Sequence, residues 1–208
     1  FHMATGSGKT VIMAALILYL YTKGYRNFLF FVNQTNVLEK TIDNFINTLS
    51  NKYLFNDVIE HLGNKIKIKK VDNFSGNTLD DDIEILFTTT QKFHMDLFEA
   101  KENSITYEDF ESNKVVFISD ESHHINSLTK KPTKDEELVK SSWEYSVMNA
   151  FHRNRDSIML EFTATCDLKD NNVFAKYQDK IIFNYPLSSF RESGYTKDFQ
   201  NFATDTDL

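Results

Sequence analysis

The sequence predicts an α/β domain with a mostly parallel, doubly wound sheet and helices on both faces. Apolar runs rich in β-branched and aromatic residues alternate with helical patterns along most of the chain. Several of these runs are almost continuously apolar, which is typical of parallel strands buried on both faces. Alternating strands and helices of these lengths imply right-handed βαβ units. The composition agrees, because 41% of the 208 residues are hydrophobic and 19 are Phe, enough for a sizeable core.

The strands are predicted at the apolar runs. These runs are residues 28–32, 83–87, 115–118, 158–162 and 181–183, and Phe1-His2 would end a further strand. Lysine and isoleucine alternate over 65–69, and this period of two predicts a strand with one wet and one buried face. We expect an edge strand that its lysines protect against aggregation, with a nucleic-acid contact as the alternative.

The helices are predicted between these strands. Lys9 to Lys23 has the pattern of a buried helix, and Asn36 to Leu49 that of an amphipathic helix with Thr35 or Asn36 as its cap. Glu136 to Phe151 is the third predicted helix. The polar segments 73–82 and 126–135 are predicted surface loops.

Charge and cysteine content exclude several classes of protein. The formal net charge of −7 argues against a protein that coats nucleic acid by bulk charge, although a local basic groove stays compatible with it. With Cys166 as its one cysteine the chain forms no internal disulfide, and the cysteine content argues against a thiolate-rich zinc or iron–sulfur site. The longest apolar run, Val11 to Tyr21, is shorter than the roughly 20 residues that cross a bilayer. We therefore expect a cytoplasmic protein without a membrane partner.

The strongest motif lies between the first predicted strand and the first predicted helix. Its glycines let the backbone curl so that successive N–H groups face a phosphate, and the helix N-terminus adds partial positive charge. Lys9 can reach the β- and γ-phosphates, and the Thr10 hydroxyl can bind Mg²⁺. The alternative is a dinucleotide fingerprint, but Val11 replaces its third glycine and leaves Lys9 and Thr10 without a role. The predicted nucleotide-binding residues are Thr5, Gly6, Ser7, Gly8, Lys9 and Thr10.

A second motif, Asp120-Glu121-Ser122-His123-His124, follows the apolar strand at 115–118. Ligands of open α/β sheets bind at such strand ends. Two adjacent carboxylates there suit a division of labour, in which Asp120 holds Mg²⁺ and Glu121 orients and deprotonates the attacking water. His123 and His124 leave zinc as an alternative, but we expect His123 to link the nucleotide site to other elements.

The third motif is Thr163-Ala164-Thr165, at the end of another predicted strand. The hydroxyls of Thr163 and Thr165 are expected to hydrogen-bond the Asp120–Glu121 loop and to couple its state to motion. Ordinary strand-end threonines are the alternative reading.

In this order and at these spacings, the motifs resemble the first RecA-like domain of superfamily 2 helicases and translocases. Motif I is ATGSGKT, motif II is DESH and motif III is TAT, and the resemblance covers nearly the whole chain. It implies a P-loop NTPase that uses ATP and Mg²⁺. It also implies that motifs Ia and Ib touch the phosphates of a nucleic-acid strand, through Asn33, Gln34, Thr89, Thr90, Gln91 and Lys92.

Within that superfamily, TTTQKF, DESHHIN and residues 185–195 look most like the restriction (Res) subunit of type III restriction enzymes. This resemblance implies an ATP-dependent translocase on duplex DNA that works with a methyltransferase or specificity subunit. A general superfamily 2 helicase acting on RNA or single-stranded DNA is one alternative, and an ATP-switched binding or scaffold domain is another. Retention of Glu121 and of the TAT motif argues against the scaffold.

The resemblance also sets the expected domain limits. Residues 1–185 would form the first RecA-like domain without its beginning, and residues 186–208 a linker toward a second RecA-like domain that carries the arginine finger. We expect the chain on its own to bind nucleotide weakly and to turn it over negligibly. Any endonuclease is expected beyond Leu208.

Overall fold

A computed structural model of the chain describes residues 1–56, 58–76, 81–99, 104–120, 134–166 and 171–196. Its centre is a five-stranded sheet in the order β5-β6-β2-β7-β8, and every neighbouring pair in it is parallel. The strands are β2 (Asn27–Val32), β5 (Ile68–Val71), β6 (Ile83–Thr89), β7 (Val115–Asp120) and β8 (Ile158–Phe162). The mostly parallel α/β sheet is therefore confirmed.

Two short strands extend the same sheet beyond β8. β1 (His2–Met3) pairs in parallel with β9 (Asn184–Tyr185), and a bridge joins His2 to Thr163 next to β8. The backbone N–H of Met3 donates to the carbonyl of Thr163 over 2.8 Å, which ties β1 to the end of β8. The β1 strand therefore lies between β8 and β9, and all of these strands run in one direction.

The strand predicted at 181–183 is displaced toward the C-terminus. The structure places β9 at Asn184–Tyr185, and the Ile182 and Phe183 side chains are 71% and 44% exposed. The reason is the short partner strand, because β1 offers a ladder of only two residues. Of the predicted strand 181–183, only the Phe183 carbonyl is hydrogen-bonded to β1, and it accepts from the N–H of His2 over 2.9 Å.

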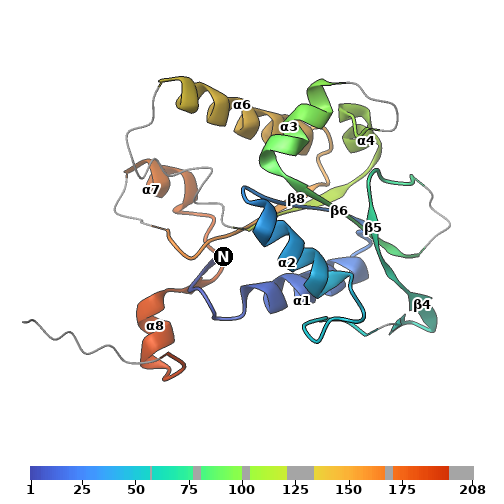
Figure 1. Ribbon diagram of the computed structural model, residues 1–208, viewed down its shortest axis with the longest axis horizontal. Coiled ribbons are helices and arrows are strands. Elements are labelled where there is room, and N and C mark those ends of the chain that lie inside the picture. Colours follow the sequence, from blue (N-terminus) through green and yellow to red (C-terminus); the bar gives the residue numbers. More distant parts are fainter. Residues whose placement is uncertain (57, 77–80, 100–103, 121–133, 167–170, 197–208) are drawn as a thin grey trace, which may run out of the picture.

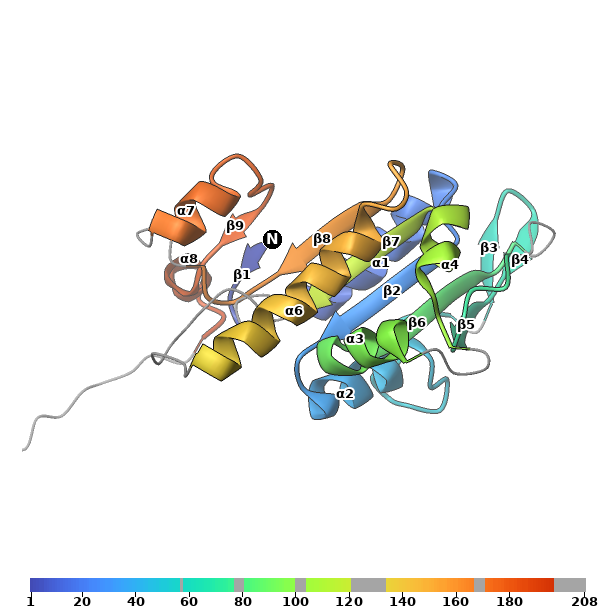
Figure 2. The same cartoon turned by 90° about the horizontal axis from the view of Figure 1, so that it is seen from above.

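Helices cover both faces of the sheet, as Figures 1 and 2 show. On one face lie α1 (Lys9–Thr22) and α2 (Thr35–Phe45), and on the other lie α3 (Thr90–Phe98), α4 (Tyr107–Ser112) and α6 (Lys134–Phe151). Successive strand residues alternate between the two faces, so each face has its own buried cluster. The first includes Met13, Ile17, Phe28, Phe30, Phe45, Val116 and Ile118, and the second includes Leu29, Phe31, Phe93, Phe110, Val115, Phe117 and Val147.

The amphipathic helix α2 begins and ends earlier than the sequence predicts. Its N-cap is Gln34 rather than Thr35 or Asn36, and the helix ends at Phe45 rather than Leu49. The turn that follows is held by the Asp43 carboxylate, which accepts from Asn47 Nδ2 over 2.6 Å and from Ser50 Oγ over 2.7 Å. These two hydrogen bonds lower the pKa of Asp43. These side-chain hydrogen bonds compete with continuation of the helix, and the spacing of apolar residues does not reveal them.

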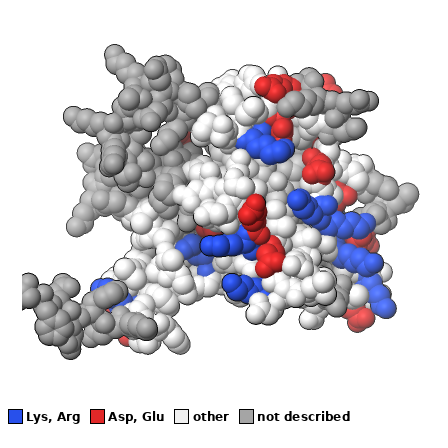
Figure 3. All heavy atoms as spheres, viewed as in Figure 1, with Lys and Arg blue, Asp and Glu red and all other residues white. Residues whose placement is uncertain are grey.

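The lysine-rich strand predicted at 65–69 is split at Lys67. β3 (Ile59–His61) and β4 (Asn64–Ile66) form an antiparallel hairpin, and β5 is the edge of the main sheet. The N–H of Lys67 donates to Asp82 Oδ1 over 2.8 Å instead of joining a ladder. Ile66 is buried while the lysines at 65, 67, 69 and 70 are exposed, so the wet and the buried face are as predicted. Basic side chains gather over this part of the surface in Figure 3.

The structure also contains helices that the sequence did not predict. They are α3, α4, α7 (Asn171–Tyr177) and α8 (Leu187–Glu192), and α8 falls in the segment expected to be a linker. Within the described ranges, no helix is both long and apolar enough to cross a bilayer.

Candidate nucleotide site

The parallel sheet brings the predicted motifs to one edge. Asp120 at the end of β7 lies opposite Phe162 at the end of β8, and the next residue, Thr163, is bridged to His2 in β1. The carboxyl ends of all these strands point the same way, so the loop after β1, Thr163 and Asp120 follow one another along the edge. Ligands of open α/β sheets bind at such an edge.

The loop between β1 and α1 has the tight curvature that its glycines allow. Gly6 has φ of 81° and Gly8, the N-cap of α1, has φ of 95°, both in the left-handed region that side chains with a Cβ avoid. The Ala4 carbonyl accepts from the N–H of Ser7 over 3.2 Å and from its Oγ over 2.7 Å, which closes the turn. We call residues 4–10 the phosphate loop.

Several backbone donors of the phosphate loop have no partner among the described residues. Among the described residues, no hydrogen bond uses the N–H groups of Gly6, Gly8, Lys9 or Thr10, whereas those of Val11 and Ile12 donate to the Gly8 carbonyl. N–H groups at the start of a helix, together with the helix dipole, make an anion site. A loop with these free donors therefore fits a phosphate chain.

The Lys9 side chain folds back over the phosphate loop. Its Nζ lies 3.4 Å from the Met3 carbonyl oxygen and 3.5 Å from that of Ala4. None of the described carboxylates forms an ion pair with it. The positive charge is thus held beside the free N–H groups by weak, long contacts that a phosphate can replace.

The residues predicted to hold Mg²⁺ lie on neighbouring elements of the same edge. Thr10 is in the first turn of α1 and Asp120 is the last residue of β7, and both are half-buried. Their hydroxyl and carboxylate oxygens are ligands that Mg²⁺ prefers, and this ion takes its remaining ligands from water and substrate phosphates. Among the described residues, no cluster of three or more His, Cys, Asp or Glu side chains occurs. Glu121 lies outside the described residues. So do His123 and His124, the two histidines of the zinc alternative.

The third motif forms a small turn of its own. Thr163 Oγ1 donates to the Thr165 carbonyl over 3.0 Å and accepts from the N–H of Thr165 over 3.1 Å. The expected hydrogen bond to the Asp120–Glu121 loop involves a segment outside the described residues and stays a prediction. Thr163 lies between the phosphate loop and the end of β7, and its coupling role also stays a prediction.

The residues predicted to contact nucleic acid gather at the ends of β2 and β6, where Val32 lies opposite Thr89. Two of the hydroxyls have protein partners. Thr89 Oγ1 accepts from the N–H of Lys92 over 3.1 Å and caps α3, and Thr90 Oγ1 donates to Asn33 Oδ1 over 2.9 Å. Thr90 is only 1% exposed. These contacts give Thr89 and Thr90 a structural role at this end of the sheet.

The remaining side chains of this group face solvent. Gln34, Gln91 and Lys92 are exposed, and Lys92 Nζ pairs with Asp96 one helical turn further along α3. Lys92 keeps 67% of its side chain exposed in this pair. Surface pairs of this kind contribute little stability, so the lysine remains available to a phosphate at small cost.

An aromatic residue that the motifs did not single out borders the phosphate loop. The Phe190 ring, on α8, has its Cε1 4.0 Å from the position that a Cβ on Gly6 would take. The Tyr185 ring lies edge-on to it and the Tyr195 ring stacks on it. The sequence has three aromatic residues within 185–195, but their spacing matches no phosphate-binding pattern and so did not indicate a place beside the phosphate loop.

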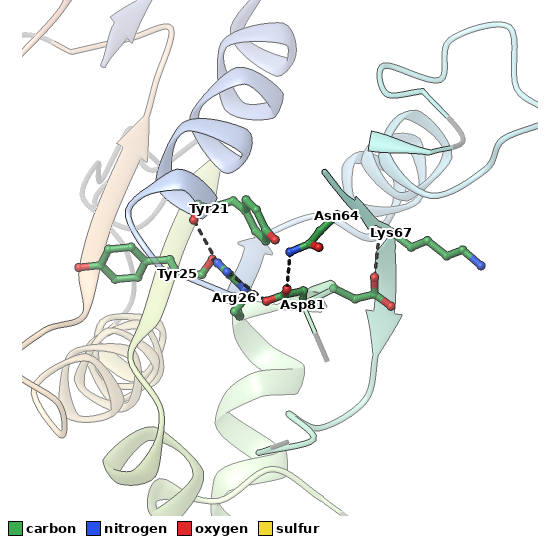
Figure 4. A network of polar contacts seen from close by, with 7 residues as sticks. Tyr21, Tyr25, Arg26, Asn64, Lys67 and Asp81 are labelled. Carbon is green, nitrogen blue, oxygen red and sulfur yellow. Dashed lines mark hydrogen bonds and ion pairs between the residues drawn. The ribbon is translucent and has the colours of Figure 1, made fainter. Parts of the chain in front are cut away.

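A polar network of a different kind lies at the amino ends of the strands, before β2 and β6 (Figure 4). The Arg26 guanidinium lies 3.8 Å from the centre of the Tyr21 ring, donates to the Tyr21 and Tyr25 carbonyls over 3.0 and 3.1 Å, and pairs with Asp81 at 3.5 Å. Asn64 donates to the same carboxylate over 3.2 Å. A hollow of about 320 Å³ lies there between residues 24–27, 81–84 and 112–114. Because its charged groups bind one another, this network stabilises the turn after α1.

Comparisons with known proteins agree with the motifs. The family described as type III restriction enzyme, res subunit, matches residues 1–168. A curated relative, the probable type III restriction-modification enzyme HindVIP Res subunit of Haemophilus influenzae, is 41% identical over 217 residues. That alignment covers 95% of this chain and 41% of the relative, so the chain spans less than half of the relative's length. The crystal structure of the UvsW helicase from bacteriophage T4 is similar over 84% of this chain and 49% of that chain, with 18% identity and a TM-score of 0.42. Because the family match extends over most of its length, the chain belongs to the family of type III restriction enzyme Res subunits.

Proposed function

We propose that this chain is the ATP-binding motor domain of an ATP-dependent DNA translocase, the restriction subunit of a type III restriction-modification system. The observation that carries the proposal is the phosphate loop. Its free N–H groups and the folded-back Lys9 fit a nucleoside triphosphate, in a chain that belongs to the Res family.

The proposed roles follow from position along the edge. Lys9 neutralises the β- and γ-phosphates, and Thr10 and Asp120 hold Mg²⁺. The bound ion supplies positive charge to the phosphate oxygens. Glu121, next in the chain after Asp120, orients and deprotonates the attacking water. Thr163 and Thr165, with His123, report the state of the site to the rest of the protein.

The motor is proposed to need a second RecA-like domain, with residues 1–185 as the first and residues 186–208 leading toward it. In such motors an arginine from outside the domain stabilises the transition state and is worth about 10³ to 10⁵ in rate. The chain alone should therefore turn over ATP very slowly. Hydrolysis would change how the two domains pack, and this change would move the protein along DNA.

The proposed polymer is duplex DNA, with a methyltransferase as partner subunit and an endonuclease elsewhere in the protein. The exposed Gln34, Gln91 and Lys92 support a phosphate contact at the ends of β2 and β6. The net charge of −7 makes such contacts local rather than a broad basic surface. The proposed site of action is the cytoplasm.

The test is steady-state ATPase of the intact protein that carries this chain, with duplex DNA, single-stranded DNA or RNA added in turn. Lys9→Ala serves as the blank, and stimulation mainly by duplex DNA is expected. Stimulation mainly by RNA or single strands would favour a general helicase, and a nucleotide-binding protein with no turnover would favour an ATP-switched scaffold.

A second pair of variants separates binding from chemistry. Lys9→Ala should lose both ATP binding and turnover. Glu121→Gln should bind ATP normally but lose about 10²- to 10⁴-fold in turnover, the usual contribution of a positioned base. Turnover at the normal rate in Glu121→Gln would remove Glu121 from its proposed role.

A further inference from the structure

Three aromatic rings form a cluster beside the phosphate loop, and we call Tyr185, Phe190 and Tyr195 the aromatic cluster. The Tyr185 and Phe190 rings meet edge to face with their centres 5.8 Å apart. The Phe190 and Tyr195 rings are stacked with their centres 6.2 Å apart and an interplanar angle of 20°. Tyr195 is nevertheless 77% exposed, so this stack presents aromatic surface to solvent.

The aromatic cluster is fixed to the strand that leads into the phosphate loop. Tyr185 pairs with Met3 in the β1–β9 ladder, and its carbonyl accepts from the N–H of Ala4 over 2.9 Å. Phe190 Cε1 then lies 4.0 Å from the position that a Cβ on Gly6 would take, so the ring borders the phosphate loop. Figure 2 shows α8 next to β1, on the side away from β7.

Polar atoms of this segment are used to hold the rings in place. The Tyr185 hydroxyl donates to Ser193 Oγ over 2.8 Å, and Ser193 Oγ donates to the Ser189 carbonyl over 2.8 Å. Gly194, with φ of 77°, turns the chain so that the Tyr195 ring comes back onto Phe190. The cluster therefore offers ring surface to a ligand from a rigid framework.

The order of the strands fixes the direction in which a bound nucleotide lies. Along the edge the order is β7, β8, β1 and β9, with Asp120 at one side of the phosphate loop and the aromatic cluster at the other. The phosphate that reacts must face Asp120, because that carboxylate belongs to the hydrolytic motif. The base, at the other end of the nucleotide, is then directed toward β9 and α8.

We propose that the rings of Phe190 and Tyr195 form the stacking surface for the purine base of the nucleotide whose phosphates occupy the phosphate loop. This inference rests on the proposed function, because it takes the phosphate loop as a nucleotide site. Aromatic rings stack on every base, since each base has a π-face. The contribution of these rings to affinity is therefore the same for ATP and GTP.

The experiment compares ligands with and without a base on the intact protein. ATP, GTP and inorganic tripolyphosphate are titrated by calorimetry into the wild type, Phe190→Ala, Tyr195→Ala and Lys9→Ala. Tyr195→Phe is the matched control, because it keeps the ring and removes the hydroxyl. Because the Tyr195 side chain is mostly exposed, Tyr195→Ala should fold normally and tests the stacking role even where Phe190→Ala is destabilised.

Loss of either ring should weaken ATP and GTP binding by about 5- to 150-fold and leave tripolyphosphate binding unchanged. Tyr195→Phe should bind all ligands like the wild type. Equal weakening of tripolyphosphate, or unchanged ATP binding in both alanine variants, would overturn the stacking role. Lys9→Ala should weaken the binding of all three ligands. If it weakens the binding of none, the phosphate loop is not the nucleotide site. Failure of the proposed function is thereby distinguished from failure of the stacking role.

Discussion

Replacing Thr90 by Val separates a structural role of this residue from a direct contact with nucleic acid. The change removes the 2.9 Å hydrogen bond from Thr90 Oγ1 to Asn33 Oδ1, together with its longer 3.4 Å contact with the Val32 carbonyl, at a position that is 1% exposed. Asn33 is half-buried, so its oxygen regains water. The expected loss is about 1 kcal/mol, since net hydrogen bonds contribute about 0.5 to 1.5 kcal/mol. For a domain of this size that lowers Tm by about 2 to 4 °C.

The assay is thermal unfolding of the chain together with DNA-stimulated ATPase of the intact protein. If Thr90 acts by holding Asn33, then Thr90→Val and Asn33→Ala should lower DNA stimulation equally, and the double variant should lose no more than either. Gln91→Ala is the matched control, because this exposed neighbour should lower stimulation without changing Tm. An unchanged Tm in Thr90→Val, or a loss of stimulation that Asn33→Ala does not share, would contradict this structural role of Thr90.

Further predictions concern the phosphate loop, the β5 edge and α3. Gly8→Ala should destabilise the chain by about 1 to 2 kcal/mol through backbone strain alone, because nothing lies within 4 Å of the added Cβ while φ is 95°; thermal unfolding measures it, and an unchanged Tm would contradict it. Burial raises the pKa of Asp82, but hydrogen bonds from the Lys69 side chain and the Lys67 N–H outweigh it and lower the pKa below 3.8. The carboxylate therefore stabilises the fold above that pH and loses its effect as the pH falls through the lowered pKa. The stability difference between wild type and Asp82→Asn should shrink in acid denaturation series, and a constant difference would oppose this. Lys92→Ala should change stability by less than about 0.5 kcal/mol and reduce the salt slope of DNA binding by about one, whereas an unchanged slope would exclude a phosphate contact.

The strands of the main sheet could be predicted because their burial on both faces produces continuous apolar runs. The runs at 28–32, 83–87 and 158–162 lie within or coincide with β2, β6 and β8. Short elements were harder to predict from the sequence, because local hydrogen bonds rather than the periodicity of apolar residues determine where they begin and end. The Asp43 turn ends α2 early, and the Asp82 carboxylate interrupts the lysine-rich strand at Lys67.

The phosphate loop was predictable for a similar reason, since its glycines, lysine and threonine are close together in sequence and each has a local role. The structure gives these residues the expected backbone, with positive φ at Gly6 and Gly8. The position of Phe190 was not predictable in this way. Its position beside Gly6 brings together residues more than 180 apart in the chain and depends on the pairing of β1 with β9.

Strand order also explains how a nucleotide and a nucleic acid could act on each other in this fold. The phosphate loop follows β1, whereas the exposed residues proposed to touch DNA follow β2 and β6 on the far side of β7. Any change passed between the two groups along this edge crosses the ends of β8 and β7, where Thr163 and Asp120 lie. Asp120 ends β7, whose other residues are buried, and Thr163 directly follows β8, so the backbone ladder between the two strands sets the positions of both residues. The motif proposed to report hydrolysis therefore lies between the phosphate loop and the residues proposed to touch DNA, because the strand order places it there.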